Sequence, residues 1–225
     1  MNRGLATAAV ALVLLPLVAG CSGLQGKASP SPSGPAPVPA GTHTTTSFQP
    51  ATTYTVGTGW VNPIDSPDYF NLALATDSNN GIHLFHNPQA LSQDAACPAA
   101  PQAGVGATAA DLVAWIRSLP GLNVSLPIMV TVGGLPATQM DVSIHGTWTR
   151  TCSFANGLPT VPLFFRSSVN LGWWVAGDEK LRLYLLDVPG QGTVVVDLDS
   201  FAGDGFGDLL TSAAPVVKSL SFAVK

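Results

Sequence analysis

Five of the ten residues at positions 30–39 are proline, and this tract divides the chain into two parts that differ in their capacity to fold. The surrounding segment, residues 22–47, shows no apolar periodicity. Proline-rich sequence favours an extended, solvated conformation, and it cannot bury enough apolar surface to offset the entropy of ordering. We therefore expect residues 21–47 to be a disordered tether and residues 48–225 to form a single domain.

The start of the chain carries the pattern of an export signal. A positively charged beginning precedes an apolar run over residues 5–18, and Ala19-Gly20 leads directly to Cys21. Residues 1–20 are therefore typical of a signal peptide. The alternatives are a secretory signal that happens to end before a cysteine and a retained transmembrane helix. The apolar run, about 14 residues long, is shorter than the roughly 20 that span a bilayer.

The cysteine at the expected cleavage point resembles the lipobox of bacterial lipoproteins. The resemblance implies cleavage after Gly20, a diacylglyceryl thioether on the sulfur of Cys21, and acylation of the new N-terminus. Two acyl chains give stable anchoring where one does not. The protein is thus expected at the extracytoplasmic face of the cell membrane.

The charge of the expected domain restricts its partners. Residues 48–225 contain seven Lys and Arg against thirteen Asp and Glu, and the basic residues form no cluster. Nucleic-acid binding relies on Lys and Arg that neutralise phosphates, so nucleic acid is disfavoured, and so is direct attraction to anionic lipid. We expect membrane contact through the lipid on Cys21, and an unidentified envelope protein or apolar ligand as partner.

Cys97 and Cys152 are the two cysteines of the expected domain. A cysteine pair in an exported domain most often forms a disulfide, and the bridge would close a loop of about 55 residues, worth about 4 kcal/mol. Two free thiols and a metal site are the alternatives, although no nearby CxxC or histidine spacing indicates zinc.

Alternating apolar residues and turn residues predict short strands. Strands are expected within residues 48–60, 70–74, 82–86, 130–132, 138–144, 163–166, 169–176, 182–186, 193–198 and 220–224, with breaks at 61–67 and 77–81. Thr108 and Asp111 form a capping pair ahead of a predicted helix over residues 109–119. A second helix is expected near 204–217, shortened or kinked by Pro215. The order predicts an α+β domain built on an antiparallel sheet meander with two or more packed helices.

Several short motifs resemble the PsbP/Mog1-like superfamily. Residues 54–60 (YTVGTGW) are similar to its V-x-x-G-W entry, and residues 215–222 are similar to its last helix and strand. Residues 112–115, 122–125 and 130–136 are similar to actinobacterial lipoproteins of this type, including the mycobacterial LpqN group. The resemblance implies this fold and a cell-envelope setting, and it transfers no catalytic residue.

Asp141, Ser143 and His145 alternate along one expected strand and so lie on one face. A catalytic triad needs the histidine between the serine and the acid, beside an oxyanion hole. Residues spaced about 7 Å apart along a strand do not form one by themselves, and no G-x-S-x-G motif is present. A polar outward face explains the three residues, with a serine hydrolase as the alternative.

Histidines and aspartates offer no clear metal-ligand pattern. His83 and His86 are three apart on a strand and face opposite sides, so they are not expected to share a metal; a surface copper or zinc site with His145 is the alternative. Four aspartates near the C-terminus depart from the EF-hand template, and helix capping and turns explain them: Asp197, Asp199, Asp204 and Asp208. We expect neither a metal nor a cofactor.

Trp173 and Trp174 are neighbours on a strand, so one is expected in the core and the other outward. Core packing is the favoured explanation of these aromatic residues; the alternative is that an outward tryptophan near Tyr184 floors a pocket for a lipid, a glycan or another apolar ligand. Without a catalytic constellation, the sequence predicts a non-catalytic binding or assembly module rather than an enzyme. The other candidates are a lipid or glycan carrier that uses this pocket and the serine hydrolase.

Overall fold

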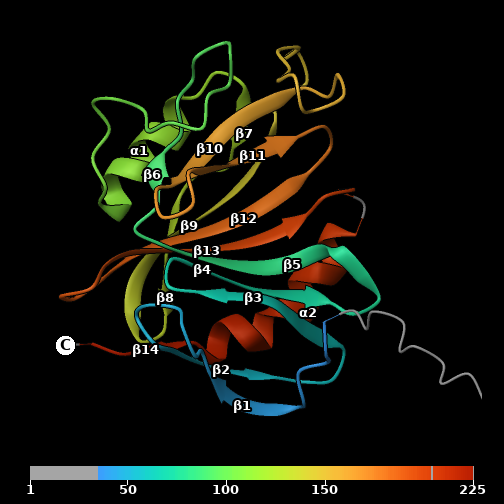
Figure 1. Cartoon of the computed structure of the whole chain (residues 1–225), viewed down its shortest axis with the longest axis vertical. Helices are drawn as coiled ribbons and strands as arrows, with labels where there is room; N and C mark the ends of the chain where they lie inside the picture. The colour runs from blue at the N-terminus through green and yellow to red at the C-terminus, as the bar shows by residue number, and fades with distance from the viewer. Residues whose placement is uncertain (1–34, 204, 225) are drawn as a thin grey trace, which may run out of the picture. The chain divides into compact units, whose positions relative to one another are not determined.

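A computed structural model describes residues 35–203 and 205–224. The predicted signal peptide, Cys21 and residues 22–34 of the predicted tether lie outside these ranges. The described residues form an α+β fold of antiparallel strand pairs and two helices (Figure 1). In this part of the chain, no helix is both long and apolar enough to cross a membrane.

Strands dominate the described residues, and one helix lies near the middle of the chain and another near its end. In chain order the elements are β1 (Gly41–Thr44), β2 (Thr52–Val56), β3 (Trp60–Ser66), β4 (Tyr69–Leu74), β5 (Asp77–His86), β6 (Gln89–Ala90), α1 (Ala109–Ser118), β7 (Leu122–Val124), β8 (Ile128–Val132), β9 (Leu135–Ile144), β10 (Thr160–Arg166), β11 (Leu171–Ala176), β12 (Lys180–Val188), β13 (Gly192–Ser200), α2 (Phe206–Ser219) and β14 (Ser221–Phe222).

The central sheet has the strand order β3-β4-β5-β13-β12-β9-β7, and β8 pairs with β9. Two smaller sheets, β1-β2-β14 and β11-β10-β6, pack against it. The order confirms the predicted fold class, with neighbouring strands often joined by short turns. Strand β13 lies in the middle and is buried at every residue from Thr193 to Ser200, because both faces of the sheet are covered.

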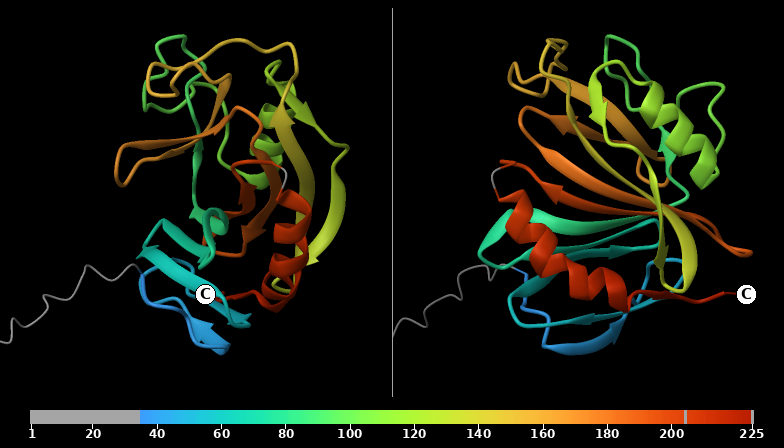
Figure 2. Two further views of the ribbon diagram at one scale, coloured as in Figure 1. Left: turned by 90° about the vertical axis from the view of Figure 1, so that its right-hand side faces the viewer. Right: turned by 180° about the vertical axis from the view of Figure 1, so that it is seen from behind.

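Two apolar cores lie on opposite faces of the central sheet. Helix α2 and the β1-β2-β14 sheet cover one face, where Leu186 and Val196 are buried. Helix α1 and the β10–β11 hairpin cover the other, where Leu183 and Phe85 are buried. Figure 2 shows α2 and the β10–β11 hairpin on opposite sides of the sheet. Side chains alternate between the two faces of each strand, so adjacent residues of β12 contribute to different cores.

Helix α1 agrees with its prediction to within one residue. The hydroxyl of Thr108 accepts a hydrogen bond from the Asp111 backbone N–H (3.2 Å), and the Asp111 carboxylate accepts one from the Thr108 backbone N–H (3.3 Å). This reciprocal capping box satisfies two donors that the first turn leaves free. The apolar stripe of the helix, including Leu112 and Ile116, is fully buried.

Helix α2 is not shortened at Pro215, which was one of the two expected effects, because it continues through this residue to Ser219. Proline removes one intrahelical hydrogen bond, here to the carbonyl of Thr211. Thr211 and Pro215 both lie on the exposed side of the helix, where water can donate to that carbonyl instead. The N-cap is Gly205, without a side-chain capping bond, and the expected cap Asp204 lies outside the described residues.

Strand β1 lies in the segment predicted as a tether. Threonine hydroxyls hold it to β2, with Thr42 bonded to Thr55 (2.9 Å) and Thr44 to Thr53 (3.1 Å). Such cross-strand threonine pairs stabilise a sheet. In the structure, folded chain therefore begins before residue 48.

Two predicted breaks lie inside strands. Strand β3 continues past Pro63 because the pairing with β4 shifts between Val61 and Ile64; an irregularity of this kind accommodates a proline. Strand β5 begins at Asp77, so the predicted turn at 77–81 is wrong. The chain turns at residues 75–76, and the pairing shifts between Ala73 and Leu74.

Candidate functional site

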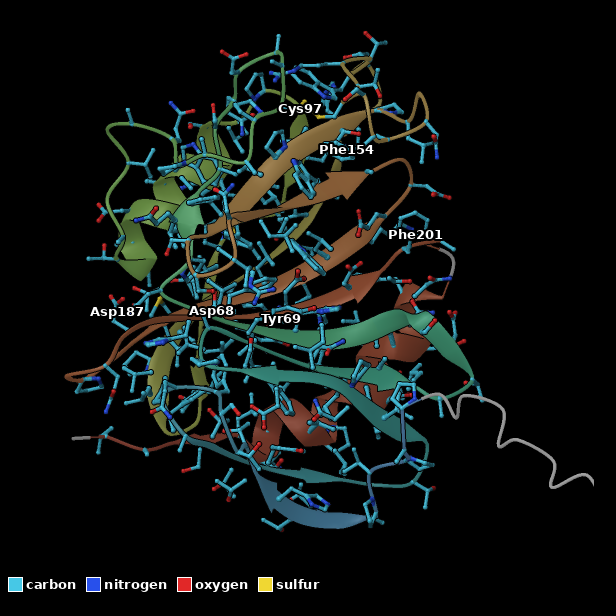
Figure 3. The ribbon with its side chains drawn as sticks, in the orientation of Figure 1. Asp68, Tyr69, Cys97, Phe154, Asp187 and Phe201 are labelled. Atoms are coloured by element: carbon cyan, nitrogen blue, oxygen red, sulfur yellow. A yellow bond between two sulfur atoms is a disulfide. The ribbon has the colours of Figure 1, made fainter. Side chains whose placement is uncertain are left out.

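A groove opens where the loop before β10, strand β11 and the end of β13 meet, with a volume of about 460 Å³. We call it the aromatic groove. Its side chains come from β11, the turn that joins β11 to β12, the end of β13 and two loops: Phe154, Leu158, Leu171, Trp173, Trp174, Glu179, Asp199 and Phe201. Figure 3 shows Phe154 and Phe201 at the same end of the domain, near the turn that joins β11 to β12.

The apolar walls of the aromatic groove are unusually exposed. The exposed fractions of its four apolar rim residues lie between 42% for Leu158 and 49% for Phe154, with Leu171 and Phe201 between them. Apolar side chains that gather in one hollow of the surface mark binding sites more often than isolated ones do. This groove is therefore the candidate site.

The two tryptophans point in opposite directions, as the alternation along β11 predicts. Trp173 points inward, where its ring lies 4.8 Å from His83 between centroids and its Nε1–H donates to Asp197 Oδ2 (3.2 Å). Trp174 lies against the exposed ring of Phe154, with the ring centroids 4.5 Å apart, and its Nε1 has no hydrogen-bond partner. Both indoles line the groove.

Tyr184 does not take part in this site. It pairs with Val196 on β13, and its side chain packs against the core that α2 covers. Its neighbour Leu183 pairs with Asp197 and faces the side of Trp173. The expectation of an outward tryptophan near Tyr184 is therefore wrong, because the alternation of β12 places Tyr184 on the opposite face of the sheet.

The disulfide between Cys97 and Cys152 supports one wall of the groove. The bridge is present in the structure, with the two Cα atoms 5.8 Å apart. Two residues before Cys152, Arg150 donates to the backbone carbonyls of Gln93 (2.7 Å) and Asp94. Together these contacts tie the loop that carries Phe154 to the loop over residues 91–107.

Three acidic side chains are buried beneath the aromatic groove. Glu179, Asp197 and Asp199 are 4%, 0% and 6% exposed. Asp197 and Asp199 alternate on β13 and share one face, which corrects the expectation that turns or helix caps account for them. The Oδ1 atoms of both have no hydrogen-bond partner, whereas Glu179 Oε2 accepts from the Ala176 backbone N–H (2.7 Å).

Burial decides the protonation of these acids. It raises the pKa of Asp197 and Asp199 well above the usual range, and the charge of Glu179 adds to the effect. Burial likewise raises the pKa of Glu179 to about 6. Because the charged form loses its hydration there, the cluster carries fewer than three negative charges at neutral pH.

His83 is a neutral neighbour of this cluster. Its Nδ1 is hydrogen-bonded to the Tyr69 hydroxyl (2.7 Å), and its Nε2 lies 4.0 Å from Asp199 Oδ2. Burial lowers the pKa of His83 to about 3. Burial also raises the pKa of Tyr69, whose ring lies 4.2 Å from the guanidinium carbon of Arg166.

His86 faces away from His83, as expected, and its ring bonds the carbonyl of Gln191 (2.8 Å). Residues 35–203 and 205–224 contain no group of three or more histidine, cysteine or acidic side chains arranged to hold a metal ion.

The strand residues Asp141, Ser143 and His145 do not assemble a triad. Both carboxylate oxygens of Asp141 accept hydrogen bonds from Arg182, at 2.6 and 2.7 Å. The ring of His145 bonds the hydroxyl of Thr147 (2.9 Å). Ser143 lines a separate shallow pocket with Asp141 and Lys180. Each member is thus committed elsewhere or exposed, as a polar outward face requires.

Sequence reasoning missed Phe154, Phe201 and Glu179 as groove residues. They come from loops and a turn, where no periodicity indicates direction. The buried acids did leave a signal. The apolar run of residues 193–198 is typical of a central strand buried on both faces, and Asp197 interrupts this run while Asp199 directly follows it. Acidic residues in such a strand are rarely buried without a partner.

Comparison with known proteins gives a limited result. No family model and no curated protein matches the sequence. The solution structure of cyanobacterial PsbP (CyanoP) from Synechocystis sp. PCC 6803 is similar, with a TM-score of 0.42, 10% identity, and coverage of 83% of this chain and 95% of that one. A crystal structure from Bacteroides thetaiotaomicron VPI-5482 has a TM-score of 0.35 and 9% identity over 77% of this chain. The match spans 46% of that chain.

Proposed function

We propose that this chain is a membrane-anchored, non-catalytic binding module of an actinobacterial cell envelope, and that the aromatic groove holds its ligand. The observation that carries the proposal is the gathering of exposed apolar side chains, led by Phe154 and Phe201, around one hollow. Covering such surface is favourable by about 25 cal/mol per Å² of apolar area. An apolar molecule or an apolar part of a partner fits these walls.

The anchoring part of the proposal is supported by the lipobox-like sequence at Cys21 and by the proline-rich segment after it. The change Cys21→Ser removes the sulfur that would carry the lipid. We expect the wild-type protein to partition into the detergent phase and the variant to move to the aqueous phase. Equal partitioning of the two proteins would contradict lipid anchoring.

The non-catalytic part is supported by the hydrogen bonds that Asp141 and His145 make with residues outside a triad. Asp141 is engaged by Arg182, and His145 bonds Thr147. A serine hydrolase needs these groups to act together on Ser143. We expect a fluorophosphonate probe to leave Ser143 unlabelled under conditions that label a control serine hydrolase.

A carrier of lipid or glycan is the second candidate function. The neighbouring rings of Phe154 and Trp174, tilted by 52° to each other, favour it, because aromatic faces bind alkyl chains and sugar faces alike. A carrier would release its ligand to an acceptor membrane, whereas an assembly module would not. Transfer of a bound fluorescent lipid to acceptor vesicles separates the two.

Binding in the groove can be tested with the neutral fluorescent probe N-phenyl-1-naphthylamine. The full chain carrying Cys21→Ser is suitable because it would carry no acyl chains on that residue to compete with the probe. We expect saturable binding, weakened about fivefold in Phe154→Ala, since the half-exposed ring contributes about 1 kcal/mol of apolar contact.

Met129→Ala provides the matched control for this titration. Met129 is 71% exposed on β8 and lies outside the groove, so its loss should leave the probe affinity unchanged. The groove is not the site if Phe154→Ala binds the probe as tightly as the wild type, or if only Met129→Ala binds more weakly.

A further inference from the structure

The floor of the aromatic groove differs in chemistry from its walls. Glu179 and Asp199 line it, and the other lining side chains are apolar, aromatic or neutral. No lysine or arginine lines the groove. Any molecule that fills the hollow therefore meets apolar surface at the rim and carboxyl groups at the base.

These carboxyl groups lack the basic partners that buried acids usually have. Asp199 Oδ1 has no hydrogen-bond partner, although the residue is 6% exposed and borders the groove. Within the described ranges, the ion pairs of lysine and arginine involve Asp68 and Asp141 and none of the three buried acids. Glu179 and Asp199 are hydrogen-bonded to each other, but burying acids without a basic partner is costly, and Asp199 Oδ1 stays available to a ligand that fills the groove.

The surroundings of Asp199 add further unpartnered polar atoms. Asp197 Oδ1, on the same face of β13, is buried without a hydrogen-bond partner, and the residue is 0% exposed. Trp174 Nε1, on the groove wall, is also unpartnered. Unsatisfied buried groups are few in native proteins, and a cluster beside a hollow indicates a bound molecule that completes them.

We propose that the aromatic groove binds an amphiphile whose cationic, ammonium-type head lies against Glu179 and Asp199 while its apolar part lies along Phe154, Leu171 and Phe201. The inference rests on the proposed ligand-binding role of the groove and assigns the chemistry of the ligand. Aromatic faces such as Trp174 attract organic cations as well as apolar chains. The absence of a suitable metal-ligand set in the described residues favours an organic cation over a metal ion.

The titratable groups around the head site predict a pH dependence. Asp197 and Asp199 face it from β13, Glu179 from the β11–β12 turn, His83 from β5 and Tyr69 from β4. Arg166, beyond Tyr69, is paired with Asp68 (3.0 Å), and the exposed Asp178 and Lys180 flank Glu179 along the chain. Burial raises the pKa of Glu179 to about 6, so a bound cation favours loss of a proton there. Affinity should therefore rise with pH across this value.

The test compares three molecules with the same ten-carbon chain on the full chain carrying Cys21→Ser. Decylammonium, decyl maltoside and decanoate each displace N-phenyl-1-naphthylamine at concentrations below micelle formation. We expect the cation to bind about tenfold more tightly than the maltoside, because a charged contact is stronger than a neutral one. Decanoate should bind most weakly.

Variants identify the source of this preference. Glu179→Gln with Asp199→Asn should bring the affinity for the cation to within about twofold of that for the maltoside. Asp178→Asn, an exposed acid next to Glu179, should leave the order unchanged. Both amides are close in shape to the acids. If the double variant does not fold, Glu179→Gln alone, with its fold checked by circular dichroism, should also reduce the preference for the cation.

The outcomes separate the two proposals. If all three molecules bind equally well, the cationic head is wrong and the groove remains a ligand site. If the preference for the cation survives in the folded Glu179→Gln variant and in the double variant, general electrostatic attraction explains it and the assignment is wrong. If neither the fluorescent probe nor any of the three binds, the proposed function fails together with the inference.

Discussion

Glu179 should make the stability of the domain fall as the pH rises, which is the reverse of a carboxylate held by an ion pair. Burial raises its pKa from 4.5 to about 6. The folded state therefore binds more protons than the unfolded state between these values, so the free energy of unfolding contributed by this group is highest below pH 4.5 and falls through pH 6. The difference in pKa corresponds to about 2 kcal/mol.

Glu179→Gln isolates this contribution. The amide keeps an oxygen that can accept from the Ala176 backbone N–H, and it carries no charge at any pH. Urea unfolding from about pH 4 to about pH 8 should show the stability of the variant relative to the wild type increasing by about 2 kcal/mol. The variant is compared with the wild type at each pH because both contain His83, which has the opposite effect. The pKa of His83 is lowered to about 3, so the stability that it contributes is lost as the pH falls from 6.5 towards that value.

The matched control is Asp178→Asn, which removes an exposed carboxylate next to Glu179. Its stability relative to the wild type should change little with pH. The unfolding free energy of Glu179→Gln is compared with that of the wild type at each pH. If the difference stays constant, or decreases as the pH rises, Glu179 is not a buried acid with a raised pKa.

Two further predictions concern stability. Replacing Cys97 and Cys152 together by alanine should lower the free energy of unfolding by about 4 kcal/mol, since the bridge joins residues 55 apart; a loss below about 1 kcal/mol in urea unfolding would contradict this. The same variant should also bind N-phenyl-1-naphthylamine more weakly, because the loop that carries Phe154 is no longer covalently linked to the loop over residues 91–107. Pro215→Ala should raise the free energy of unfolding by about 2 kcal/mol, because it restores a backbone donor in α2; unchanged thermal unfolding would show that the helix already absorbs the proline without cost.

Elements with local signals could be predicted from the sequence. The helix over 109–118 has its capping box and its apolar stripe within a dozen residues, and the hairpin of β12 and β13 has turn residues between alternating runs. The pairing of Cys97 with Cys152 follows from their number once the domain is predicted to be exported. For the helix and the hairpin, the interactions that fix the structure lie within one short segment. For the disulfide, two cysteines allow only one pairing.

Features set by distant contacts could not be predicted. Strand β1 is held by β2, and Pro215 is tolerated because of which side of α2 faces the core. Tyr184 is separated from Trp173 by the register of β12 against β13, which no single strand reveals. The groove brings together two loops and a turn far apart in sequence, so its floor and walls became visible only in three dimensions.

Photolabelling tests the central claim, that the aromatic groove holds an apolar ligand, most directly. The full chain carrying Cys21→Ser is irradiated with a ten-carbon chain that bears a terminal diazirine, and the modified peptides are sequenced by mass spectrometry. We predict labelling within residues 151–159 and 171–201, and its loss in Phe154→Ala. Labelling confined to the exposed apolar residues Leu126, Ile128 and Met129, with none in the groove, would contradict the account.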